Sequence, residues 1–313
     1  MQPAFVFPGQ GSQAVGMGKD LAGAFSIAKL VFEEVDETLK QKLSRLMFEG
    51  PEADLTLTEN AQPALMAVSM AVVRVLETEG KYQLPRRGRF VAGHSLGEYS
   101  ALAAAGTFSL ADAARLLRQR GQAMQAAVPV GKGAMAAVLG VDLDAARAIA
   151  KEAAQGDVCA AANDNAPGQV VISGTKEAVE RAAIIAPNHG AKRVIMLPVS
   201  APFHCPLMAP AADGMAEALA KVTMVPPSLP VVCNVTAAAS TDIAEIRRLL
   251  VEQVTGTVRW RESVLYMKEQ GVDTLIEIGA GKVLSGLAKR IDKDLTGVSI
   301  GTPADLEKFL ATV

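Results

Sequence analysis

The chain has 313 residues, half of them hydrophobic and a fifth charged, which predicts a globular protein with one large domain and room for a small one. The net charge of −2 argues against a nucleic-acid-binding protein. No apolar run reaches the roughly 20 residues that a membrane helix needs, and the first residues do not resemble a signal peptide. Three widely spaced cysteines suggest reduced thiols in a cytoplasmic protein, and three histidines without a C-x-x-C pair argue against a metal site.

The first part of the chain is predicted to start with a strand, pass through helical stretches, and reach a second strand that is followed by two helices. These elements are expected at residues 4–7, up to about 46, 62–80, 90–92, 98–105 and from 109 to before 129. Ser109 is the expected N-cap of the last helix, with Asp112 three positions further on.

The middle of the chain changes to the order βαββαβ, which is typical of a ferredoxin-like fold. The elements are expected at 134–139, 143–154, 158–162, 169–173, 176–186 and 193–199, with a turn at 163–168. Residues 130–199 are therefore predicted to form a small inserted subdomain.

Beyond residue 200 the predicted strands again alternate with helices. A helix is expected after Pro206, followed by elements at 231–235, 246–254, 273–278, 282–291 and 297–300. This alternation predicts a mostly parallel sheet covered on both faces, hence an α/β fold. Residues 1–129 and 200–313 are predicted to form one large domain.

The segment Gly93-His94-Ser95-Leu96-Gly97 lies between a predicted strand and a predicted helix. A G-x-S-x-G turn in this context holds its serine in a strained conformation above the end of a sheet. A side chain at either glycine would collide across the turn, and the serine hydroxyl would lie at the positive end of the helix. The pattern predicts acyl transfer through an ester on Ser95, with an ordinary glycine-rich turn as the alternative.

A nucleophilic serine needs a base, and the chain offers three histidines. His94 adjoins Ser95 in the turn, where consecutive side chains point apart, and His189 lies in a Pro-Asn-His-Gly sequence typical of a surface turn. His204 follows a predicted strand, and sites in α/β proteins form at the carboxyl ends of strands. An imidazole titrates near neutral pH, as a base for a hydroxyl requires. His204 is therefore the candidate base, with a packed or loop histidine as the alternative.

Helical periodicity distinguishes Arg120 from the other arginines. Leu110, Ala113, Leu117 and Met124 share one face of the helix predicted from residue 109, and Arg120 falls on that face. A guanidinium facing the interior needs an acidic side chain, carbonyl groups or an anionic ligand, and its planar fork matches a carboxylate. An internal ion pair, or a side chain that reaches out to solvent, is the alternative.

Two glycine-rich loops resemble parts of nucleotide-binding sites. Gly9-x-Gly11-x-x-Ala14 fits a dinucleotide fingerprint, but residues 31–36 look helical where that fold needs a second strand. Gly279-Ala280-Gly281-Lys282 lacks the spacing of a phosphate loop. We interpret it as a tight connection between a strand and a helix.

Six segments in order resemble the malonyl-CoA:acyl carrier protein transacylases of bacterial type II fatty acid synthesis, and the resemblance runs essentially end to end. The segments are FVFPGQGSQ, GHSLGEYSAL, QRGQAMQ, NAPGQVVISG, VSAPFHCPLM and EIGAGKVLSGLAKRI. Together they are far more specific than any single motif. The resemblance implies a large α/β-hydrolase-like domain with a ferredoxin-like insert, which agrees with the predicted element order.

The resemblance implies a role for each residue that matches the catalytic motifs. Ser95 is the expected nucleophile and His204 the expected base. The backbone carbonyl of Gln253 is expected to orient the histidine in place of an acidic side chain. The backbone N–H groups of Gln10 and Leu96 are expected to form the oxyanion hole.

The resemblance also implies how the substrates are recognised. Arg120 is expected to bind the free carboxylate of a malonyl group, Phe203 is similar to the residue found in malonyl-selective relatives, and Asn163 is expected to line the pocket. The substrates would be malonyl-CoA and phosphopantetheinylated acyl carrier protein, with no bound cofactor and a monomeric enzyme. Because carrier proteins are acidic, Lys192-Arg193 and Lys289-Arg290 are candidate docking residues, or else solvated faces.

Two positions depart from many relatives: Ala280 stands where proline is common, and Gly256-Thr257 stand where Asn-Pro is common. Three alternatives stay open. They are a hydrolase that uses water as acceptor, an acyltransferase for another extender unit or pathway, and a carrier-binding protein without catalysis. Arg120 and the insert argue against a plain esterase, and the intact serine and histidine argue against the binding protein.

Overall fold

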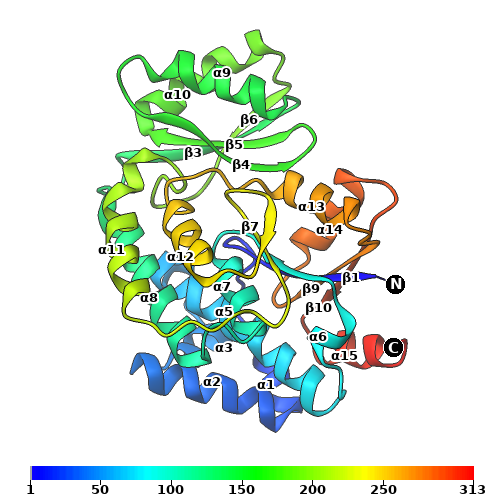
Figure 1. Cartoon of the computed structure of the whole chain (residues 1–313). Coiled ribbons are helices and arrows are strands. Elements are labelled where there is room, and N and C mark those ends of the chain that lie inside the picture. Colours follow the sequence, from blue (N-terminus) through cyan, green and yellow to red (C-terminus); the bar gives the residue numbers. More distant parts are fainter. Residues whose placement is uncertain (1) are drawn as a thin grey trace.

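The computed structural model describes residues 2–313, whose strands form two sheets (Figure 1). Sheet A contains β1 (Pro3–Phe7), β2 (Phe90–Gly93), β7 (Val231–Cys233), β8 (Ala238–Ser240), β9 (Thr274–Ile278) and β10 (Thr296–Ile300). Sheet B contains β3 (Gly133–Leu139), β4 (Cys159–Ala166), β5 (Gln169–Thr175) and β6 (Arg193–Met196).

Sheet A has the order β10-β9-β1-β2-β7-β8, and its strands are parallel except for β8. Alternate residues of β1 enter different cores, because successive side chains point to opposite faces. Phe5 and Phe7 belong to the larger core, whereas Ala4 and Val6 belong to the smaller one. A parallel sheet buried on both faces is the α/β architecture that the sequence predicts, and this prediction is confirmed.

Helices cover both faces of sheet A. The smaller core is closed by α13 (Trp260–Glu269) and α14 (Val283–Ile291). The larger core takes residues from α1 (Lys19–Ala24), α2 (Ser26–Leu39), α3 (Leu43–Glu49), α4 (Glu52–Thr56), α5 (Thr58–Thr78), α6 (Leu84–Arg87), α7 (Leu96–Ala104), α8 (Leu110–Ala127), α11 (Ala209–Ala220), α12 (Ile243–Glu252) and α15 (Pro303–Leu310).

Sheet B has the order β4-β5-β3-β6 and is antiparallel throughout. Together with α9 (Leu143–Ala154) and α10 (Lys176–Ile185) it forms the small lobe, drawn in green at the top of Figure 1. These elements share a hydrophobic core of their own. The order βαββαβ is the ferredoxin-like arrangement expected from the sequence. The exact domain boundaries at 130 and 199 stay predictions.

Several predicted bounds are wrong. β4 continues to Ala166 through the predicted turn at 163–168, with irregularities in its pairing to β5, so the turn is confined to Pro167 and Gly168. β6 ends at Met196 rather than 199, and α5 begins at Thr58 rather than 62. The short helices η1 (Ala186–His189) and η2 (Pro206–Met208), as well as β8, α13 and α15, were not predicted.

A short segment outside the small lobe, residues 257–261, follows the free edge of β4. The N–H of Asp164 donates to the Val258 carbonyl (2.9 Å), and Thr257 Oγ1 donates to the Ala161 carbonyl (2.7 Å). Asp164 is buried and forms an ion pair with Arg261 (2.8 Å). The two lobes are therefore joined by hydrogen bonds and a charge pair in addition to the chain itself.

Candidate active site

The candidate site is built around the turn between β2 and α7, at the carboxyl end of sheet A. Ser95 has φ 54° and ψ −111°, which places a non-glycine residue in a strained region. A Cβ added to Gly93 would lie 1.9 Å from the Gly97 carbonyl carbon, and one added to Gly97 would lie 2.2 Å from the Phe7 carbonyl oxygen. The prediction of a collision across the turn is confirmed for Gly93, whereas Gly97 is required because a side chain there would collide with the backbone of β1.

His204 lies against the serine. Its Nε2 is 2.8 Å from Ser95 Oγ, and its Nδ1 is 2.8 Å from the backbone carbonyl oxygen of Gln253. A carbonyl only accepts hydrogen bonds, so Nδ1 carries the proton and Nε2 offers a lone pair to the hydroxyl. Burial and the charge of Arg120 lower the pKa of His204 to about 3, so the imidazole is neutral at physiological pH.

Arg120 completes the group of side chains at Ser95. It is 1% exposed, and its Nη2 donates to Ser95 Oγ (3.0 Å) and to Gln253 Oε1 (2.9 Å). Nη1 donates to Gln62 Oε1 (2.8 Å), whereas Nε has no partner among residues 2–313. The predicted inward orientation of Arg120 is confirmed. The two alternatives, an internal ion pair and a side chain that reaches solvent, do not hold, since Arg120 is buried and forms no ion pair with the described residues. A buried guanidinium with an unpaired N–H is suited to an anionic ligand.

The close approach of α8 to α5 positions this arginine. A Cβ on Gly121 would lie 2.5 Å from Glu59 Cα, so only glycine permits the contact. The approach brings Arg120 within reach of Gln62 on α5. Hydrogen bonds continue from Gln62 to Thr58 and from Thr58 to Gln10 Oε1, linking α8 to the loop after β1.

The backbone N–H groups of Gln10 and Leu96 are available for a ligand. Gln10 lies in the loop after β1, and Leu96 is the first residue of α7, where an N–H has no partner within the helix. In the described part of the chain, neither N–H donates a hydrogen bond.

Two further predicted site residues are buried, Phe203 directly before His204 and Asn163 within β4. The small-lobe residue that contacts the turn is Asn165, whose Oδ1 lies 2.8 Å from His94 Nε2. His189 lies in η1, where Nε2 is 2.7 Å from Glu152 Oε2 of α9, so it takes no part in the site.

The sequence analysis missed Asn234, which holds the turn on both sides of Ser95. Its Oδ1 accepts from the Ser95 N–H (2.8 Å), and its Nδ2 donates to the Gly93 carbonyl (2.7 Å). Asn234 directly follows β7 and is fully buried. Its place at the carboxyl end of a parallel strand was the signal that could have identified it.

The two glycine-rich loops are not nucleotide sites. The loop after β1 leads to α1 only at Lys19, so no helix opens directly at Gly9-x-Gly11 as a dinucleotide fold requires. At the start of α14, the Glu277 carboxylate accepts from the N–H groups of Leu284 (3.1 Å) and Ser285 (2.7 Å). These are the groups that a phosphate would need. The interpretation of Gly279 to Lys282 as a strand–helix connection is confirmed.

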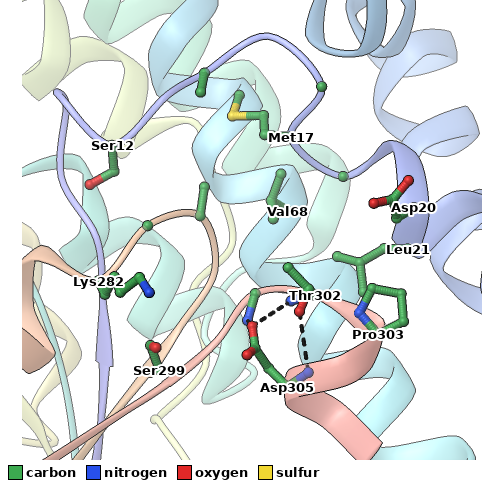
Figure 2. A pocket seen from close by; sticks show the side chains of 16 residues that line it. Ser12, Met17, Asp20, Leu21, Val68, Lys282, Ser299, Thr302, Pro303 and Asp305 are labelled. Atoms are coloured by element: carbon green, nitrogen blue, oxygen red, sulfur yellow. Dashed lines mark hydrogen bonds between the residues drawn. The ribbon is translucent and has the colours of Figure 1, made fainter.

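This connection borders a hollow of about 400 Å³, whose lining does not include Ser95, His204 or Arg120 (Figure 2). Lys282, Ser299 and Ser12 lie along one side, and Asp20 lies opposite. Asp305 turns back to cap its own helix and so is not free to face a ligand. In residues 2–313, no cluster of His, Cys, Asp or Glu could hold a metal ion, and no helix is long and apolar enough to cross a membrane.

A strained serine, a neutral imidazole fixed by a carbonyl and a buried arginine meeting at one oxygen define a serine-dependent acyl-transfer site. Residues 4–296 match the acyl transferase domain family. The chain belongs to this family and, within it, to the malonyl-CoA:acyl carrier protein transacylases.

Three comparisons carry this assignment. The malonyl CoA-acyl carrier protein transacylase of Bacillus subtilis is 47% identical, over 99% of this chain and 96% of that protein. The acyl-carrier-protein-S-malonyltransferase of Bartonella henselae is 55% identical, with a TM-score of 0.97 over 100% of this chain and 99% of that one. A malonyl-transacylase solved in complex with a type II PKS acyl-carrier protein is 45% identical, with a TM-score of 0.96 over 100% of both chains.

Proposed function

We propose that this enzyme transfers a malonyl group from malonyl-CoA to the phosphopantetheine thiol of acyl carrier protein, through a malonyl ester on Ser95. The transfer would supply fatty acid synthesis. One observation carries the assignment of residues: His204 and Arg120 both lie within hydrogen-bond distance of Ser95 Oγ. The transacylase relatives, and the neighbour bound to a carrier protein, support the choice of substrates.

In the first step Ser95 Oγ attacks the thioester carbonyl of malonyl-CoA while its proton passes to His204 Nε2. The tetrahedral intermediate collapses with cleavage of the carbon–sulfur bond. The imidazolium returns its proton to the departing CoA sulfur. The Gln253 carbonyl keeps the ring oriented throughout, since it accepts from Nδ1 in both protonation states.

In the second step the carrier thiol replaces CoA. His204 takes the thiol proton as the sulfur attacks the malonyl ester, then returns it to Ser95 Oγ as the ester bond breaks. The enzyme is restored, and the kinetics are ping-pong. In both steps the oxyanion would be bound by the N–H groups of Gln10 and Leu96, which have no other partner among the described residues.

Arg120 would select the acyl group. Its Nε and Nη2 form the side of the guanidinium that turns toward Ser95 and matches a carboxylate in bidentate geometry. An acetyl group has no carboxylate, so the buried charge would stay without its ligand. Phe203, which directly precedes His204, and Asn163, which bridges to Val258, are both buried and would limit the space around the acyl chain.

We further propose that the enzyme is monomeric, needs no bound cofactor and works in the cytoplasm. Residues Cys159, Cys205 and Cys233 are free thiols, in keeping with a reducing compartment.

Intact-mass analysis after brief mixing with malonyl-CoA or acetyl-CoA tests the function. A malonyl adduct on Ser95 that passes to holo acyl carrier protein is the expected result. An adduct lost to water, with malonate released and the carrier left unloaded, would instead identify a hydrolase. A folded enzyme that forms no adduct would contradict the proposal.

A further inference from the structure

We propose that Glu98 is a positioning residue for the transfer reaction: its ionised carboxylate holds the Gln253 amide in place and supplies the buried negative charge that faces Arg120. The inference rests on the proposed function of Ser95, His204 and Arg120. It adds to that site a group which none of the steps above uses.

Glu98 lies three residues after the serine on α7 and is 1% exposed. One of its oxygens, Oε2, accepts from Gln253 Nε2 (2.9 Å) and from the Asn234 backbone N–H (3.0 Å). Asn234 in turn holds both sides of Ser95. A single carboxylate oxygen therefore connects the two residues that fix the catalytic turn and the base.

Gln253 contacts the site through both its backbone and its side chain. Its backbone carbonyl accepts from His204, and its side-chain Oε1 accepts from Arg120. A glutamine amide can be flipped with little change of shape, which would direct an NH₂ group at the arginine. An ionised Glu98 only accepts hydrogen bonds, so it binds Nε2 and directs Oε1 toward Arg120. The Ser95 carbonyl (3.0 Å) and Asn234 Oδ1 (3.2 Å) also accept from Nε2, so the carboxylate acts together with them to hold this amide orientation.

The charge of Glu98 matters separately from its hydrogen bonds. Arg120 is buried and makes no ion pair in the described part of the chain, and a buried cation without a counter-charge is costly. Glu98 faces it across one amide group and is the carboxylate whose charge acts on it. The negative charge also favours the imidazolium that forms during attack, because the interior screens charges poorly.

Ionisation of Glu98 falls in an accessible pH range. Burial raises its pKa to about 7, against the opposing effects of Asn234, Gln253 and Arg120. The neighbouring Tyr99 and Cys233 have pKa values raised by burial, to about 12 for Tyr99, and stay neutral near pH 7. Arg120 stays charged. A proton can bind at Oε1, which is buried without a partner, while Oε2 keeps both of its bonds.

The pH dependence of Ser95 loading, meaning its acylation by the malonyl group, distinguishes titration of Glu98 from titration of the base His204. The pKa of His204 is about 3, so that group does not titrate between pH 5.5 and 8. Wild-type loading should therefore decline below about pH 7, as Glu98 takes up a proton, and level off at a rate about 10- to 100-fold lower. A short malonyl thioester that lacks phosphate groups is the substrate, because it has no titration of its own in this range.

Three variants test the proposal by rapid-quench measurement of the malonyl adduct. Glu98→Gln keeps the shape and an acceptor oxygen but removes the charge. We expect loading at pH 8 to fall about 10- to 100-fold, with no decline between pH 8 and 5.5. Glu98→Ala also removes the acceptor and should load still more slowly. Glu277→Gln is the matched control: it changes a buried carboxylate of β9 that accepts from the start of α14, so it should lower stability and leave the loading rate and its pH dependence unchanged.

Wild-type loading rates in Glu98→Gln and Glu98→Ala would overturn the proposal. So would an unchanged acidic decline in Glu98→Gln, or equal losses in Glu277→Gln, which would indicate general destabilisation. Failure of the proposed function is distinguishable, because the wild-type enzyme itself would then form no malonyl adduct.

Discussion

Replacement of Arg120 by alanine should change which acyl group the enzyme accepts. The substitution removes a buried fork whose Nη2 lies 3.0 Å from Ser95 Oγ and whose Nε has no partner. It leaves Ser95 and His204 in place. The loss should therefore fall on substrates that carry a free carboxylate.

The expected magnitude follows from the two hydrogen bonds of a bidentate carboxylate. Hydrogen bonds to charged groups are worth about 1.5–3 kcal/mol each, so two of them correspond to about 3–6 kcal/mol. Since 1.36 kcal/mol is tenfold in rate, kcat/KM for malonyl-CoA should fall by about 10² to 10⁴. Acetyl-CoA loses only the contact of Arg120 with the serine, so its kcat/KM should change much less. Arg120→Lys keeps the charge without the fork and should lie between the two.

The assay is the rate of Ser95 acylation by each thioester, measured by intact mass in the pre-steady state. Circular dichroism and a thermal melt check folding, since the substitution leaves the acceptors on Gln62 and Gln253 unpaired. Equal losses with malonyl-CoA and acetyl-CoA would refute the reasoning. So would a malonyl rate that stays within a few-fold of wild type in a folded variant.

Three further predictions concern stability and the carrier. Gly97→Ala would place a methyl group 2.2 Å from a backbone oxygen and should destabilise the fold by about 3 kcal/mol in urea titrations, whereas Gly286→Ala, with nothing within 4 Å, should not. Burial raises the pKa of Glu98 from 4.5 to about 7, so this group makes stability fall as pH rises through this range, by about 3 kcal/mol. The lowered pKa of His204 acts in the opposite direction below about pH 6.5, so the test is the difference in free energy of unfolding between the wild type and Glu98→Gln. A difference that stays constant from pH 4.5 to 8 would contradict the prediction. Charge reversal at the exposed Lys192 and Arg193 should raise KM for the carrier about tenfold without slowing malonyl loading. Charge reversal at the exposed Lys289 and Arg290 tests the other candidate surface in the same assay. If both variants have the wild-type KM for the carrier, neither surface binds it.

The elements with a strong periodic signal were predicted well from sequence. The helix expected at 143–154 has these bounds, and Ser109 accepts from the Asp112 N–H as a cap should. Arg120 stood out because a charged residue broke an apolar stripe. The turn at Ser95 stood out because glycines at fixed spacing flank the serine.

Other parts of the site left no comparable signal. Gln62 lies on α5, which is buried on nearly every side, so a functional polar residue does not interrupt a clear apolar face. Gln253 acts through its backbone carbonyl, which every residue has, and the sequence alone does not identify it. Glu98 resembles an ordinary acidic residue in the first turn of a helix, where the helix dipole favours negative charge. Its burial depends on β7 and on the end of α12, which are distant in sequence.

The segment from Gln253 to Arg261 has one end in the catalytic site and the other on the small lobe. Gln253 holds His204, while Thr257 and Arg261 bind residues of β4. Moving the small lobe away would pull on the residues that keep the base in position. The position of the base is therefore coupled, through one short segment, to the contact between the two lobes.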